Sequence, residues 1–143
     1  MSTADWIKFK GNAKGTDTKP ELAWDEFAKQ NYISSFKPHS FWVYDEEAKG
    51  FEFTPVRGIL GHPGGDQRRG PLPAYIEIDG PYHRTPRQVR KTEWRDELIT
   101  HRGDCRILHI DSELLLKEKY WLKLYQEVQK FLILGKLVGH VYA

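Results

Sequence analysis

The chain of 143 residues has one cysteine, one methionine and no long apolar run. A single cysteine, Cys105, excludes an internal disulfide and a zinc site built from several cysteines, and we expect it to be a buried packing residue. A membrane-spanning helix needs about 20 apolar residues, and no such stretch is present. The first residues also lack a signal-peptide core, so the sequence predicts a cytoplasmic protein.

The chain also lacks an excess of either charge, because 22 basic and 20 acidic residues leave a formal net charge of only +2. This balance does not by itself indicate a nucleic-acid-binding protein. Aromatic residues make up 13% of the chain and charged residues 29%, which is typical of a folded, soluble domain. We expect an N-terminal arm over residues 1–17 and one domain over residues 18–143.

The most informative stretch is Ala74–His83, which alternates apolar and polar residues and ends at Asp-Gly-Pro. It predicts a β-strand followed by a turn. Side chains alternate faces along a strand, so Glu77 and Asp79 share one face. Their carboxylates are close enough to bind a divalent cation, Mg²⁺ or Mn²⁺, between them. The plain alternative is a solvated strand face with two exposed acids.

His83 follows Asp79 by four residues across the predicted turn. It can fold back toward the acids as a general acid, a base or a ligand. Basic residues flank the same strand and are candidates for contacts with DNA phosphates. A solvated basic face explains them equally well. These basic residues are Arg68, Arg69, Arg84, Arg87, Arg90, Lys91 and Arg95.

Residues 18–31 predict a helix, because Thr18-Lys19-Pro20-Glu21 has the form of a capping box. Leu22, Trp24 and Phe27 would form its buried side. Glu21 either completes the cap or supports the candidate site, and the two roles do not exclude each other. Aromatic runs at 41–44 and 51–53 predict a β-hairpin.

The stretch 58–73 is rich in glycine and proline and predicts a long loop that contains Asp66. Residues 86–101 then predict a helix and residues 105–110 a strand parallel to the first one. A long helix should begin at Asp111 or Ser112 and end at Gly135. Its apolar stripe, from Trp121 to Leu132, is expected to be core, with a dimer contact left open.

Three segments together resemble a known family: IEIDGPYH at 76–83, WRDEL at 94–98 and GDCRIL at 103–108. They are similar to the core of the very-short-patch-repair-like branch of the PD-(D/E)XK nuclease superfamily. The resemblance implies an α/β (α+β) fold with a central mixed β-sheet flanked by helices, a restriction-endonuclease-like core. It also implies metal-dependent hydrolysis of phosphodiester bonds in double-stranded or branched DNA.

Carried over by position, Asp79 matches the metal-binding acid of this family, His83 its active-site histidine and Glu77 the accompanying acid. Glu21 matches a supporting acid on the first helix. The sequence lacks a lysine two residues after Glu77, and the nearest match to a Pro-Asp element places Asp66 as a further metal ligand.

Three functions therefore compete. The first is a metal-dependent DNA endonuclease of the mismatch-nicking, homing, restriction or junction-cleaving kind. The second is a catalytically inactive DNA-binding or assembly module with the same fold. The third is a structural protein whose apolar stripe docks a partner.

Overall fold

The computed structural model describes residues 17–44, 50–60, 72–80, 85–102 and 105–143. Every helix in this part of the chain is too short or too polar to cross a bilayer. In chain order the elements are α2 (Lys19–Gln30), β1 (Ser35–Phe36), β2 (Phe41–Tyr44), β3 (Gly50–Phe53), β4 (Arg57–Ile59), β5 (Ala74–Asp79), α3 (Pro86–Arg102), β6 (Arg106–Asp111), α4 (Ser112–Leu116), the 3₁₀ turn η2 (Glu118–Tyr120), α5 (Trp121–Leu134) and β7 (Val138–Val141).

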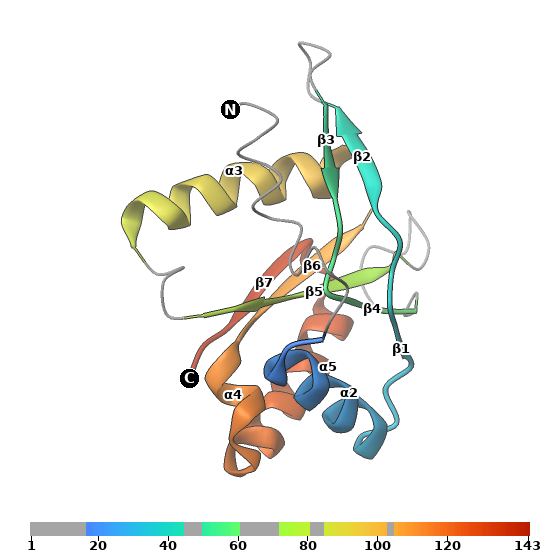
Figure 1. The fold of residues 1–143 in the computed structure, drawn as a ribbon, viewed down its shortest axis with the longest axis vertical. Helices are drawn as coiled ribbons and strands as arrows, with labels where there is room; N and C mark the ends of the chain where they lie inside the picture. The colour runs from blue at the N-terminus through green and yellow to red at the C-terminus, as the bar shows by residue number, and fades with distance from the viewer. Residues whose placement is uncertain (1–16, 45–49, 61–71, 81–84, 103–104) are drawn as a thin grey trace.

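Five strands form a mixed sheet in the order β1-β4-β5-β6-β7, and β2 and β3 form a separate hairpin. The β1–β4 and β4–β5 pairs are antiparallel, whereas β5–β6 and β6–β7 are parallel. The crossover helix α3 joins β5 to β6. Helix α3 lies on one side of the sheet, and α2, α4 and α5 lie on the other (Figure 1). The predicted α/β architecture with a central mixed sheet is confirmed at this level.

The main core lies between the sheet and the three helices α2, α4 and α5. Ile76, Leu108 and Ile110 enter it from the strands, and Phe27 and Leu124 enter it from the helices. A smaller cluster on the other side of the sheet joins the hairpin to α3 and includes Cys105. Cys105 is a free, buried thiol, as the sequence predicted.

Helix ends follow the predicted chemistry. The hydroxyl of Thr18 accepts a hydrogen bond from the Glu21 backbone N–H, and α2 begins there. Asp111 caps α4 in the same way, and α5 ends at Gly135, whose φ of 76° is left-handed. The predicted hairpin, the helix over 86–101 and the parallel strand after it are all present within one or two residues.

Several predicted boundaries were wrong. The expected loop from Gly58 is strand β4 as far as Ile59, and Gly58 is needed there because the ring of Phe36 on β1 lies against its backbone. The long C-terminal helix breaks at Lys117, where the indole of Trp121 donates to the freed carbonyl of Leu115. Leu22 is exposed, while Trp24 and Phe27 are buried.

Candidate active site

The candidate site lies on the α3 side of the three parallel strands, toward their carboxyl ends. Parallel pairing places Glu77 on β5 beside His109 on β6, and His109 beside His140 on β7. Two residues further along the same strands, Asp79 pairs with Asp111. Because side chains alternate faces with period two, this register forms a polar row across one face of the sheet. Carboxyl ends of parallel strands are the usual place for ligand sites in open α/β sheets.

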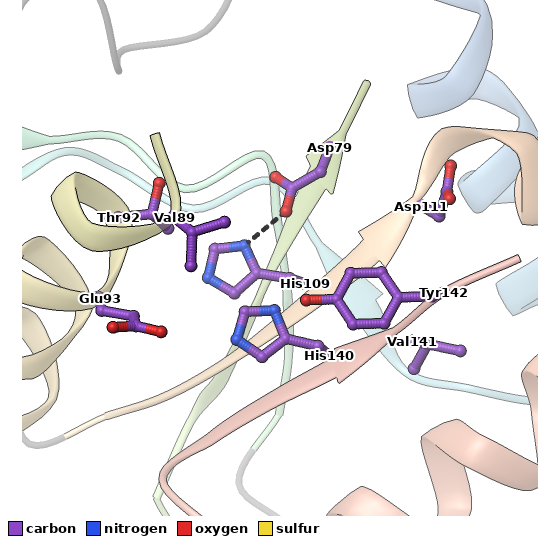
Figure 2. Close-up of a pocket in the computed structure, with 9 residues that line it drawn as sticks. All are labelled: Asp79, Val89, Thr92, Glu93, His109, Asp111, His140, Val141 and Tyr142. Carbon is purple, nitrogen blue, oxygen red and sulfur yellow. Dashed lines mark ion pairs between the residues drawn. The ribbon is translucent and has the colours of Figure 1, made fainter. Parts of the chain in front are cut away.

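A cavity of about 410 Å³ lies between these strand ends and the first half of α3. Figure 2 shows Val89, Thr92 and Glu93 on the helix side and the imidazoles of His109 and His140 on the strand side. Helix positions three and four apart share a face, so Val89, Thr92 and Glu93 approach the sheet together. The remaining lining residues are Asp79, Asp111, Val141 and Tyr142.

The ring of His109 is held between two carboxylates. Its Nδ1 lies 3.0 Å from Asp79 Oδ2, and its Nε2 lies 2.5 Å from Asp96 Oδ2. The other oxygen of Asp96 accepts from Arg95 Nη2 at 3.0 Å. His109, Asp96 and Arg95 are all at most 3% exposed, whereas the side chain of Asp79 is 23% exposed. A buried chain of charges therefore ends at a partly exposed carboxylate.

These contacts set the protonation of the chain. Burial lowers the pKa of His109, but the adjacent carboxylates of Asp79 and Asp96 outweigh it and raise that pKa to about 9. Burial likewise disfavours the charged form of Asp96, but His109 and Arg95 hold its pKa below the usual range. Without a bound ion, His109 is therefore a buried cation at neutral pH.

Glu77 lies beneath this chain and does not line the cavity. Its side chain is buried, and Oε1 has no hydrogen-bond partner among the described residues. Burial raises its pKa to about 7, although the charges of Arg95 and His109 act in the opposite direction. Glu77 is thus close to half-protonated at neutral pH. Its position does not favour the predicted role as a metal ligand.

His140 and Tyr142 form the outer part of the site. The His140 ring stacks on His109 with centroids 4.6 Å apart, and Tyr142 stacks on His140 at 5.6 Å. Burial and the charge of His109 lower the pKa of His140, so this imidazole is neutral at pH 7. Asp79, His109 and His140 each offer a ligand atom, and these atoms lie within 4.8 Å of one another.

Of the three predicted site acids that the structure describes, Asp79 lines the cavity, whereas Glu77 and Glu21 do not. Glu21 lies beside Arg57, with Oε2 4.0 Å from Nη1, in a separate cluster with Asp17 and Asp25. That cluster joins α2 to β4. Asp66 and His83 lie outside the described residues, as do Arg68, Arg69 and Arg84.

The remaining predicted basic residues are on α3. Arg87 and Arg90 are exposed, and Lys91 is half-buried. Arg95 is buried, bound to Asp96 and placed over the ring of Phe53, so its guanidinium is not positioned to contact a phosphate. The DNA-binding role of the exposed residues stays a prediction, and that of Arg95 does not fit its position.

Three residues of the site were not predicted from the sequence: Asp96, His109 and His140. A signal for His109 was present, because residues 107–111 alternate as Ile-Leu-His-Ile-Asp. Pairing that strand in parallel with the acid-bearing strand would have placed His109 beside Glu77. Asp96 and His140 required the helix orientation and strand β7, which the sequence did not reveal.

Comparison of the chain with family models, with curated proteins and with solved structures finds no match in any of the three.

Proposed function

We propose that this protein is a divalent-metal-dependent endodeoxyribonuclease with a restriction-endonuclease-like core, which hydrolyses phosphodiester bonds in double-stranded or branched DNA. One observation carries the proposal. Asp79, the acid that the motif singles out, lies at the end of β5 in a cavity with two imidazoles, directly under a helix that begins with basic residues.

The architecture supports this reading. The resemblance implies a central mixed sheet flanked by helices, and the motif segments here lie on an acid-bearing strand, a crossover helix and a parallel strand of such a sheet. The motif segments IEIDG and WRDEL lie on β5 with the residue after it and on α3, and Asp79 lines the same cavity as the helix. The sequence motif is therefore also a cluster in space.

The donor set fits a divalent cation, because a carboxylate and two imidazoles converge at one place. A bound cation would polarise the scissile phosphate and lower the pKa of the attacking water. Asp79 would hold the cation together with His109, whose Nδ1 gives up its proton when the ion binds. His83, outside the described residues, stays the predicted proton acceptor. Glu77 lies beneath the chain, close to the charges of His109 and Arg95, and would not touch the substrate.

Helix α3 supports a polyanionic substrate. Its first turn contains no acid, and Arg87 and Arg90 lie near its N-terminal end. Cations at a helix N-terminus are unfavourable next to the positive end of the helix dipole. A phosphate bound there would relieve this repulsion, and such contacts give affinity without sequence choice.

Cleavage of supercoiled plasmid and of mismatched or branched duplexes, with Mg²⁺ or Mn²⁺, tests the proposal. Asp79→Asn should slow cleavage by at least about 100-fold, because several kcal/mol of charge stabilisation are lost and each 1.36 kcal/mol is tenfold in rate. Glu97→Gln, an exposed acid on α3, is the matched control and should cleave like the parent. Equal cleavage by Asp79→Asn and the control would exclude the proposed site.

The second candidate is an inactive DNA-binding or assembly module. The burial of Glu77 favours it, because the second acid of the motif does not reach the cavity. Binding of branched or duplex DNA without cleavage under any metal would identify this function. Neither binding nor cleavage would leave the third reading, a structural protein.

A further inference from the structure

The orientation of His109 is fixed from behind. Oδ2 of Asp96 contacts Nε2 of His109. Arg95 in turn donates a hydrogen bond to Oδ1 of Asp96 and fixes that carboxylate. A histidine that binds a metal through one nitrogen almost always gives its other N–H to a carboxylate or carbonyl. The chain Arg95-Asp96-His109 has this arrangement and leaves Nδ1 facing Asp79 at the cavity.

Nδ1 of His109 is buried and lacks a hydrogen-bond partner among the described residues. It lies only 3.0 Å from Asp79 Oδ2, but the two groups are not aligned as a hydrogen bond. Two donor atoms on one ion, each bound at about 2.0–2.2 Å, lie roughly 3.0–3.5 Å apart for angles between 90° and tetrahedral. The observed separation is thus already that of two ligands sharing a cation.

His140 can complete the set. Its ring is exposed, and it lies parallel to His109 with an interplanar angle of 8°. Parallel rings do not aim their lone pairs at one point, so His140 must rotate out of the stack to bind. An exposed side chain changes rotamer at little cost.

Donor chemistry then selects the metal. Imidazole nitrogens suit first-row transition metals, whereas Mg²⁺ prefers oxygen ligands and near-ideal octahedral geometry. The carboxylates of Glu93 and Asp111 also line the cavity. Asp111 is already used, since it caps α4 and accepts from the Ala143 backbone N–H at 3.4 Å.

We propose that Asp79, His109 and His140 form a site for a divalent first-row transition metal such as Mn²⁺, Co²⁺ or Zn²⁺, with Asp96 as the positioning residue that directs His109 Nδ1 at the ion. The metal site would be the cation site of the proposed nuclease, and to that extent the inference rests on the proposed function. Binding of the ion itself needs no DNA.

Titration of the metal-free protein with Co²⁺, followed by the visible absorption of bound Co²⁺ and by calorimetry, tests the site directly. One ion should bind per chain, Zn²⁺ should displace it, and a large excess of Mg²⁺ should not. His140→Ala should weaken Co²⁺ binding by at least about 100-fold, while His101→Ala, an exposed histidine on α3, is the matched control and should bind like the parent. Asp96→Asn should weaken binding by about 10–100-fold and change the absorption spectrum.

Equal effects of His140→Ala and His101→Ala, or displacement of Co²⁺ by Mg²⁺ as readily as by Zn²⁺, would overturn the site. His140 is exposed, so that variant keeps the test valid if Asp96→Asn does not fold. Transition-metal binding without DNA cleavage would contradict the proposed nuclease function, whereas the proposed metal site would stand. Cleavage with Mg²⁺ by a protein that fails to bind Co²⁺ would contradict the proposed metal site, whereas the proposed nuclease function would stand.

Discussion

The two faces of strands β5, β6 and β7 differ in chemistry although the same backbone carries both. The face toward α2, α4 and α5 is a continuous apolar core, to which the strands contribute Ile76, Leu108, Ile110 and Val141. The opposite face is apolar only near the hairpin and becomes a row of acids and imidazoles toward the strand ends. Along each strand, residues that pack in the core therefore alternate with residues that face the candidate site.

Buried charge is treated differently on the two faces. On the apolar face, Arg106 has carbonyl partners: its guanidinium donates to Phe131 and Leu132 near the end of α5 and to Lys136 just after it. A cation at a helix C-terminus is favourable and satisfies carbonyls that the helix leaves free. On the other face, Arg95 and His109 are compensated by carboxylates. Such paired burial adds little net stability but fixes orientation.

The largest effect on stability should come from the apolar face. Ile110→Ala removes a side chain that is 0% exposed, and its free energy of unfolding should fall by about 2–5 kcal/mol because a cavity remains. Ile133→Ala makes the same deletion at a position that is 61% exposed and should change stability by less than about 0.5 kcal/mol. Urea unfolding of the two variants measures these changes. Equal losses of unfolding free energy in Ile110→Ala and Ile133→Ala would contradict the assignment of Ile110 to the core and Ile133 to the surface.

The polar face should instead make stability depend on pH. The folded pKa values of Glu77 and His109, about 7 and about 9, lie above their ordinary values of 4.5 and 6.5. Each group therefore contributes stability that is full below its ordinary pKa and is lost as the pH rises through its folded pKa. In chelator, the stability of the parent should decrease from about pH 5 to about pH 9.

Glu77→Gln separates the two groups. The variant lacks the part of the stability decrease that lies between pH 4.5 and about 7. Its free energy of unfolding should therefore rise relative to that of the parent as the pH increases over this range. The gain is on the order of 3 kcal/mol, from about 2.5 pKa units at 1.36 kcal/mol each. Urea unfolding at about pH 5 and about pH 8 measures it. A difference between variant and parent that does not change with pH would show that Glu77 ionises normally.

The smallest effect is expected outside both faces, at Glu21. Glu21→Gln keeps the helix cap, which uses the Glu21 backbone N–H and the Thr18 hydroxyl. It weakens only a 4.0 Å contact with Arg57, which Asp25 and Asp17 also bind, so stability should change by about 0.5 kcal/mol or less. Cleavage should be unchanged. A loss of cleavage at unchanged stability would return Glu21 to the site.

Local patterns predicted the elements that position the site. Alternation over Ala74–Asp79, the capping residues Thr18 and Asp111, and the helix end at Gly135 all depend on neighbouring residues in the chain. Strand β7 was missed because Val-Gly-His-Val is short, and its one strand neighbour among the described residues, β6, is about thirty positions away. Strand β4 was missed because Gly58 looked like a loop residue, although its contact is the ring of Phe36.

The candidate site was predicted only where its chemistry is local. Asp79 could be identified from the strand and turn around it. Asp96 and His109 meet through the packing of α3 on the sheet, and His140 joins them through strand register, neither of which a single sequence contains. Glu77 was predicted on the correct strand face, but its surroundings below the cavity depend on side chains from two other elements, α3 and β6.

Strand β7 lies at the edge of the sheet, with β6 as its one strand neighbour among the described residues. Edge elements open locally at a lower free energy than the central strands, so amides of β7 should exchange with solvent before those of β5 and β6. His140 moves with that strand, whereas Asp79 and His109 stay on the inner pair. Fraying of this edge strand would thus give an ion held by all three residues one route of release, and amide exchange in β7 should become slower when such an ion binds.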